Sequence, residues 1–178
     1  MYKTFLPILL MFLMSNSLLA QTPLYPIVQG FGGIYEIEGV SLIADDEEIK
    51  IVIDLKSESP DKKALNPGLN NVARLMNLHG LNGTPKNRLK VVVVGHGLAT
   101  QSLLTNHGYQ KKNGVDNPNL ALIKALKAAG AEIKICGQSL IGRGFAQDEV
   151  NPEVQIRLSM LTEVTARLNK GYHLMVFN

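Results

Sequence analysis

The sequence has very little cysteine: Cys136 is the only one among 178 residues. A chain with one cysteine forms no internal disulfide, so its fold depends on its core alone. The length suits a single domain with a core large enough for this purpose. The unpaired cysteine is therefore buried and inert, joined to another molecule, or chemically used, and its presence alone leaves all three open.

The sequence also lacks a large excess of charge of either sign. The formal net charge is +3, and charged residues make up 19% of the chain. No stretch gathers lysine and arginine into a basic stripe, which argues against nucleic acid and against an anionic membrane surface as partners. Beyond the N-terminal segment, no apolar run reaches the roughly 20 residues that cross a bilayer.

Motifs for metals and cofactors are missing as well. None of the four histidines stands at a metal-ligand spacing from another histidine or from the cysteine, so no zinc site is expected. The segment 95–97, Gly-His-Gly, lacks the third glycine and the helix-opening spacing of a dinucleotide fingerprint. No serine-elbow motif is present either. The sequence therefore predicts no metal and no cofactor.

The long apolar run that the chain does have lies at its N terminus. Lys3 precedes an almost unbroken apolar run from Phe5 to Met14, and a short polar patch then leads to Ala20. This order is typical of a secretory signal peptide cleaved after Ala20. A membrane anchor is the alternative, but the run is shorter than a bilayer requires. We expect residues 1–20 to be a signal peptide and the mature chain to be periplasmic or secreted.

The remainder of the chain alternates between strand and helix patterns. Residues 21–48 carry several prolines and glycines and are interpreted as an N-terminal arm or short hairpin laid over a domain of residues 49–178. In that domain, short β-branched runs predict strands, while apolar residues at helical spacing between caps and glycines predict helices. The expected strands are 49–55, 89–95, 131–136 and 172–177; the expected helices lie within 66–83, 117–130 and 151–171, the last capped by Asn151, with a short helix after Cys136.

This order predicts an α/β fold. Strands that alternate with helices form a mostly parallel sheet with helices on both faces and right-handed crossovers. Ligands of such sheets bind beyond the carboxyl ends of the strands. His96 directly follows the strand 89–95, and Cys136 ends the strand 131–136. If these strands are neighbours, the two side chains lie at the same edge.

Cys136 is the candidate reactive group at this edge. Gln138 or Ser139 is expected to cap a short helix whose amino end points at the sulfur, and Arg143 is a candidate cation close by. Both features favour the thiolate. Gly97 lets the backbone turn sharply after the first strand end. The alternative is that the cysteine is a small buried hydrophobe without a chemical role.

Three segments of the chain resemble a known family. "KVVVVGHGLATQSLL", "NPNLALIKALKAAGAEIKICGQSL" and "RLSMLTEVTARLNKGYHLMVF" are similar to the DsrE/DsrF-like sulfur-carrier superfamily, in particular to its small exported bacterial members. The likeness covers most of residues 26–177. It implies a flavodoxin-like three-layer α/β sandwich with a mostly parallel sheet of about five strands, and a homo-oligomer, often a trimer or hexamer.

The resemblance also implies a function. In the sulfur-relay members a cysteine carries sulfur as a persulfide and passes it to a partner protein, and that cysteine corresponds to Cys136. The chain would then be a sulfurtransferase-like carrier with a sulfur donor or acceptor protein as its partner. A fold does not guarantee an activity, so a non-catalytic oligomeric module that binds a small ligand or protein around a structural cysteine is the alternative. In either case the candidate pocket residues beside Cys136 are His96, Gly97, Gln138, Ser139 and Arg143.

Overall fold

A computed structural model describes residues 21–43 and 47–177. The predicted signal peptide, residues 1–20, lies outside the described residues, as do residues 44–46 and 178. Five strands form one all-parallel sheet in the order β4-β3-β2-β1-β5, which confirms the predicted α/β fold. The strands are β1 (Ile49–Leu55), β2 (Leu89–Gly95), β3 (Glu132–Cys136), β4 (Gln155–Arg157) and β5 (His173–Phe177).

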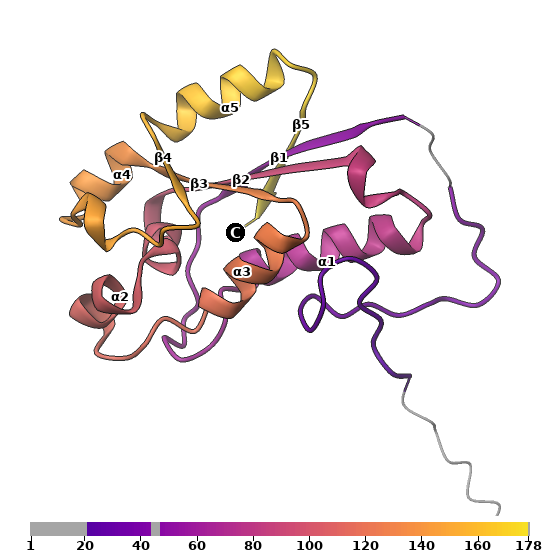
Figure 1. The fold of residues 1–178 in the computed structure, drawn as a ribbon, viewed down its shortest axis with the longest axis horizontal. Helices are drawn as coiled ribbons and strands as arrows, with labels where there is room; N and C mark the ends of the chain where they lie inside the picture. The colour runs from indigo at the N-terminus through magenta and orange to yellow at the C-terminus, as the bar shows by residue number, and fades with distance from the viewer. Residues whose placement is uncertain (1–20, 44–46, 178) are drawn as a thin grey trace, which may run out of the picture.

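Helices cover both faces of the sheet, so the molecule has three layers (Figure 1). α1 and α3 lie on one face and α5 lies on the other. The α-helices are α1 (Pro67–Leu81), α2 (Asn106–Asn113), α3 (Leu120–Ala128), α4 (Gly137–Gly142) and α5 (Met160–Leu168), and the 3₁₀ helices are η1 (Lys86–Arg88), η2 (Gly97–Leu103) and η3 (Gln147–Glu149).

The two faces of the sheet differ in how they are packed. The large apolar cluster lies between the sheet and the α1 and α3 layer, where residues such as Ile53, Leu69 and Leu126 are fully buried. The cluster under α5 is small and consists of three sheet valines and Val164, with Met160 and Tyr172 packed beside it. Strand β2 is buried on both faces, as its continuous run of valines predicts.

The expected helix 151–171 is wrong in its first half. Asn151 does not cap a helix; its side chain accepts a hydrogen bond from the N–H of Glu153 at 2.9 Å and closes a turn. The short strand β4 follows, and α5 begins only after Ser159, whose hydroxyl accepts from the N–H of Leu161. An Asn-Pro pair starts turns as readily as helices, and a three-residue strand is too short to show a periodic pattern.

The arm is a short hairpin that lies against α1. Leu24 and Ile34 form an isolated antiparallel bridge. The buried side chain of Asn77 in α1 accepts hydrogen bonds from the N–H groups of Ile27 and Val28 at 2.9 and 2.7 Å, and it also donates to carbonyls of the arm. One amide side chain thus satisfies several backbone groups of a segment that has almost no secondary structure of its own.

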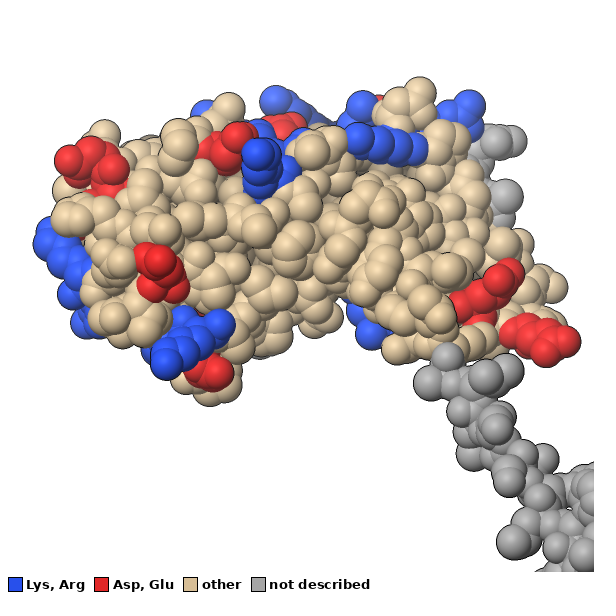
Figure 2. All heavy atoms as spheres, turned by 60° about the horizontal axis from the view of Figure 1, so that its bottom comes forward, with Lys and Arg blue, Asp and Glu red and all other residues tan. Residues whose placement is uncertain are grey.

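The surface of this side of the molecule carries little charge. Figure 2 shows mostly uncharged side chains, with charged residues mainly along the margins. Among residues 21–43 and 47–177, no helix combines the length and apolar character that crossing a bilayer requires.

Candidate functional site

The candidate site lies at the carboxyl edge of the sheet, where β2 and β3 end side by side. These strands are neighbours, and their register pairs Gly95 with Ile135. The next residues, His96 and Cys136, therefore stand in one row. The backbone of His96 is extended, so the alternation of side chains continues past the end of β2. Both side chains are placed on the α5 face of the sheet.

The sulfur of Cys136 lies among hydrogen-bond donors. The residue is 4% exposed and immediately precedes α4. Burial opposes ionisation of the thiol, but the hydroxyl of Ser139 and the backbone N–H groups of Met160, Ser139 and Gln138 point at the sulfur and together hold the pKa of Cys136 below its ordinary value. The sequence predicts Gln138 or Ser139 as the cap of this helix, which is wrong, because Cys136 itself occupies the cap position.

A second pair of polar side chains lies next to the cysteine. His96 Nε2 is 2.5 Å from Oδ1 of Asp54, which comes from β1. Because a carboxylate only accepts, Nε2 carries the proton in this bond. Both side chains are mostly buried. Asp54 was not among the residues expected from the sequence; the available signal was an acidic residue in the otherwise apolar second half of a buried strand.

Ser139 connects the two halves of the site. Its hydroxyl oxygen accepts a hydrogen bond from the backbone N–H of Gly97 at 3.2 Å, in addition to its contact with Cys136. Gly97 has φ = +54°, a conformation that side chains with a Cβ rarely adopt. The glycine therefore lets the chain turn directly after His96 and present its N–H to the serine.

The remaining expected site residues are placed differently. Gln138 contributes its backbone N–H, while its side chain is exposed. Arg143 is exposed at the end of α4 and is not among the groups that lower the pKa of Cys136. The arginine beside the cysteine is instead Arg157, its partner in the register of β3 and β4. Its guanidinium is hydrogen-bonded to Glu163 at 2.7 Å.

The part of the chain that the structure describes contains no cluster of three or more histidine, cysteine or acidic residues suited to a metal ion. The arrangement at the carboxyl edge contains the groups that a cysteine nucleophile requires. It combines a thiol with stabilising donors and an imidazole held by a carboxylate, which are the groups that activate cysteine for attack and move protons during it.

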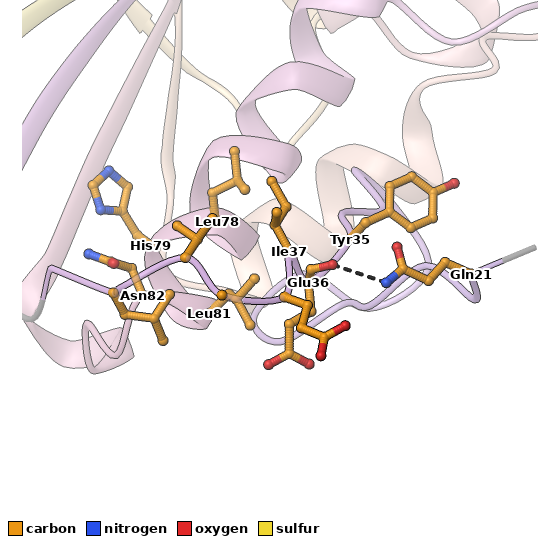
Figure 3. A pocket seen from close by; sticks show the side chains of 12 residues that line it. Gln21, Tyr35, Glu36, Ile37, Leu78, His79, Leu81 and Asn82 are labelled. Carbon is orange, nitrogen blue, oxygen red and sulfur yellow. Dashed lines mark hydrogen bonds between the residues drawn. The ribbon is translucent and has the colours of Figure 1, made fainter.

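A cavity lies elsewhere, between the arm and the C-terminal end of α1 (Figure 3). It measures about 690 Å³ and contains none of the residues at the carboxyl edge. Glu36 lines it and accepts a hydrogen bond from Gln21 through its backbone carbonyl at 3.0 Å (Figure 3). Its apolar lining consists of Tyr35, Ile37, Val40, Leu42, Leu78 and Leu81. The cavity is therefore suited to apolar contact, and the reactive groups are separate from it.

Comparison with known proteins places this chain in a family. The structure is similar to that of MTH1491 of Methanobacterium thermoautotrophicum, a protein of unknown function. The superposition covers 72% of this chain and 99% of MTH1491, with 15% sequence identity and a TM-score of 0.52. The ychN protein of E. coli shows the same coverage, with 19% identity and a TM-score of 0.49. No curated protein matches the sequence. The family model of the DsrE/DsrF-like family matches residues 50–177, and the chain belongs to that family.

Proposed function

We propose that the protein is a sulfur carrier in which Cys136 accepts sulfur as a persulfide and passes it on. The observation that carries this proposal is the set of donors around the sulfur of Cys136, which lower the pKa of a buried thiol. A thiolate is the form that attacks a sulfur donor, so stabilising it in the resting protein favours sulfur transfer. Membership of the DsrE/DsrF-like family also supports a function in sulfur transfer.

The first experiment is the alkylation rate of Cys136 against pH in the folded mature protein, read by intact mass. The expected half-point lies below that of a free thiol, about 8.5. The same protein, treated with glutathione persulfide, is expected to gain one sulfur atom. Cys136→Ser removes the only thiol of the chain, so it should fold and gain no sulfur. Labelling that requires denaturant, or sulfur retained by Cys136→Ser, would overturn the proposal.

We also propose that the protein acts as a homo-oligomer, a trimer or hexamer. Large apolar side chains are exposed around the thinly packed α5 face and the edge strand β5; they are Leu158, Leu161, Leu168, Leu174 and Val176. Apolar surface of this kind supports a subunit contact. Light scattering at micromolar concentration tests this, and Leu161→Glu is expected to lower the mass. A monomeric wild type would exclude it.

The export of the chain is likewise a proposal, and it rests on the N-terminal sequence pattern alone. Expression of the full chain in a bacterium, followed by intact mass of the periplasmic fraction, should give a protein that begins at Gln21. A protein that keeps its first 20 residues and stays in the cytoplasm would rule export out.

The apolar cavity favours a second candidate, a binding module without chemistry at the cysteine. A cavity of about 690 Å³ has the size of small-molecule sites. Under this candidate an apolar fluorescent probe binds the protein, Leu78→Glu in the lining of the cavity prevents binding, and Cys136→Ser has no effect. Sulfur loading of Cys136 that is independent of Leu78 would decide in favour of the carrier.

A further inference from the structure

We propose that His96, held by Asp54, is the proton donor to the thiol that leaves when Cys136 takes sulfur from an alkyl persulfide. This inference rests on the proposed function and names both a catalytic residue and a substrate class for it. His96 and Asp54 form the second pair of polar side chains at the carboxyl edge, and neither is needed to stabilise the thiolate.

The placement of His96 favours this role. Neighbouring strands of a sheet are about 4.8 Å apart, and His96 and Cys136 occupy the same row on the same face. Nε2 of His96 is engaged by Asp54, whereas Nδ1 makes no hydrogen bond to any residue that the structure describes. One ring nitrogen is therefore anchored, and the other is left for a group bound beside the cysteine.

The cysteine does not require His96 as a base. The groups that lower the pKa of Cys136 are the Ser139 hydroxyl and three backbone N–H groups, and His96 is not among them. These donors stay in place whatever the state of the imidazole. The two neighbouring groups can thus have separate tasks, with Cys136 as nucleophile and His96 as acid.

The proposed step is balanced without an oxidant or reductant. The thiolate of Cys136 attacks the outer sulfur of R–S–SH; a new S–S bond forms, the old S–S bond breaks, and the bonding pair leaves with the R–S group. The imidazolium of His96 gives its Nδ1 proton to R–S⁻, which departs as R–SH. The new Cys136–S–SH then returns a proton to the imidazole and remains as the persulfide anion. Asp54 is the positioning residue, since its carboxylate holds Nε2–H in both states.

The acidity of the leaving thiol determines whether such a donor is useful. An alkyl thiol has a pKa of about 8.5, so its thiolate leaves slowly unless it is protonated. An aromatic thiol is much more acidic and leaves without help. A positioned acid contributes about 10²- to 10⁴-fold to such a step. His96 should therefore matter for alkyl donors and not for aromatic ones.

The test compares two disulfides that report the same attack by Cys136. With oxidised glutathione, His96→Gln is expected to slow formation of the mixed disulfide by about 100-fold. With the aromatic dithiobis(nitrobenzoate), the rate should stay within about threefold, since little proton donation is needed. In His96→Gln, the rate of sulfur loading from glutathione persulfide should fall by about the same factor as the rate of reaction with oxidised glutathione. Asp54→Asn should show the same selectivity to a smaller extent, and His173→Gln, an exposed histidine at the amino end of β5, should match the wild type.

Other outcomes would overturn the inference. Equal slowing of both disulfides by His96→Gln would mean that His96 supports the thiolate itself. Unchanged rates with both would mean that it takes no part. In either case wild-type protein that still gains sulfur on Cys136 leaves the carrier proposal standing, whereas wild-type protein that gains none removes that proposal independently of His96.

Discussion

The hydroxyl of Ser139 accepts a hydrogen bond from the N–H of Gly97 at 3.2 Å and also contacts the sulfur of Cys136. Accepting from Gly97 uses a lone pair of the oxygen and leaves the hydroxyl proton for the sulfur. Ser139 comes from α4 and Gly97 from the loop after β2, so one side chain couples the geometry of two strand ends. This relationship makes Ser139 the side chain on which the state of the thiol depends most.

Ser139→Ala is expected to raise the pKa of Cys136 toward its ordinary value. The substitution removes the only side-chain donor to the sulfur among residues 21–43 and 47–177 and leaves three backbone donors in place. Hydrogen bonds to charged groups contribute about 1.5–3 kcal/mol, partly replaced by water, so alkylation at pH 7 should slow by roughly tenfold. The measurement is the alkylation rate as a function of pH.

Gln138→Ala is the matched control for this prediction. Gln138 donates to the sulfur through its backbone N–H, and its exposed side chain can be removed without loss of that bond. The alkylation profile of Gln138→Ala should follow the wild type. Equal profiles for Ser139→Ala and wild type would show that the serine hydroxyl does not stabilise the thiolate.

A cluster of ion pairs links the α5 layer to the sheet. Glu163 is buried and accepts hydrogen bonds from Nε of Arg157 at 2.7 Å and from Nε of Arg167 at 2.9 Å. The ammonium of Lys134, also buried, lies 3.9 Å from the same carboxylate and 3.0 Å from Glu132. Since the apolar cluster on this face is small, these ion pairs position α5, and with it the Met160 N–H that points at Cys136.

Glu163→Gln should therefore destabilise the protein. It leaves the buried Lys134 and the two arginines without their shared anion, and breaking a buried pair costs about 3–5 kcal/mol when one partner is removed, less when an amide keeps some hydrogen bonds. We expect a loss of about 2–3 kcal/mol in the free energy of unfolding, measured by urea denaturation. Glu153→Gln, an exposed glutamate without an ion pair among the described residues, should change it little. Equal stability of both variants would contradict the assigned role.

Stability should fall on acidification because of the same cluster. Burial would raise the pKa of Glu163, but hydrogen bonds from Arg167 and Arg157 and the nearby Lys134 outweigh it, and the native pKa is lowered from 4.5. A lowered native pKa means that the contribution is complete above the unfolded value and is lost as pH falls through the native value. Unfolding free energy should therefore decrease below about pH 4.5, with a smaller slope in Glu163→Gln. If the unfolding free energy of the wild type and of Glu163→Gln fell equally steeply with pH, Glu163 would not be the source of the acid sensitivity.

The fold was largely predictable from the sequence because the signals for its central elements are long and consistent. The valine run of β2 and the helix within 66–83 show clear periodicity, and the α/β order follows from them. The strand β4 and the start of α5 were missed, since Asn151-Pro152 is compatible with both a turn and a helix start. The deciding interaction there is the contact of Asn151 with the N–H of Glu153, which no spacing reveals.

The site was only partly predictable. Sequence order placed His96 and Cys136 at strand ends, and the sheet makes those ends neighbours. Asp54 could not be assigned, because its meeting with His96 depends on β1 and β2 being adjacent and in register. Arg143 was expected by proximity in sequence, whereas the sheet brings Arg157 beside the cysteine from a strand that was not foreseen.

The arm is attached to α1 mainly through one buried side chain, that of Asn77. Asn77 is fully buried and binds the arm at the N–H groups of Ile27 and Val28 and at the carbonyls of Phe31 and Gly32. Asn77→Ala removes these partners at once, and each buried group left unsatisfied costs about 1–3 kcal/mol. The arm has few other hydrogen bonds, so it should release locally rather than unfold the sheet.

Limited proteolysis measures this release. Asn77→Ala should be cleaved within residues 21–43 at least about tenfold faster than the wild type, while the urea midpoint of the remaining domain changes little. Asn71→Ala, on the exposed side of the same helix, is the control and should be cleaved as slowly as the wild type. The cavity between the arm and α1 depends on this attachment, so Asn77→Ala should also abolish binding of any apolar probe there. Unchanged cleavage would show that apolar contacts alone hold the arm.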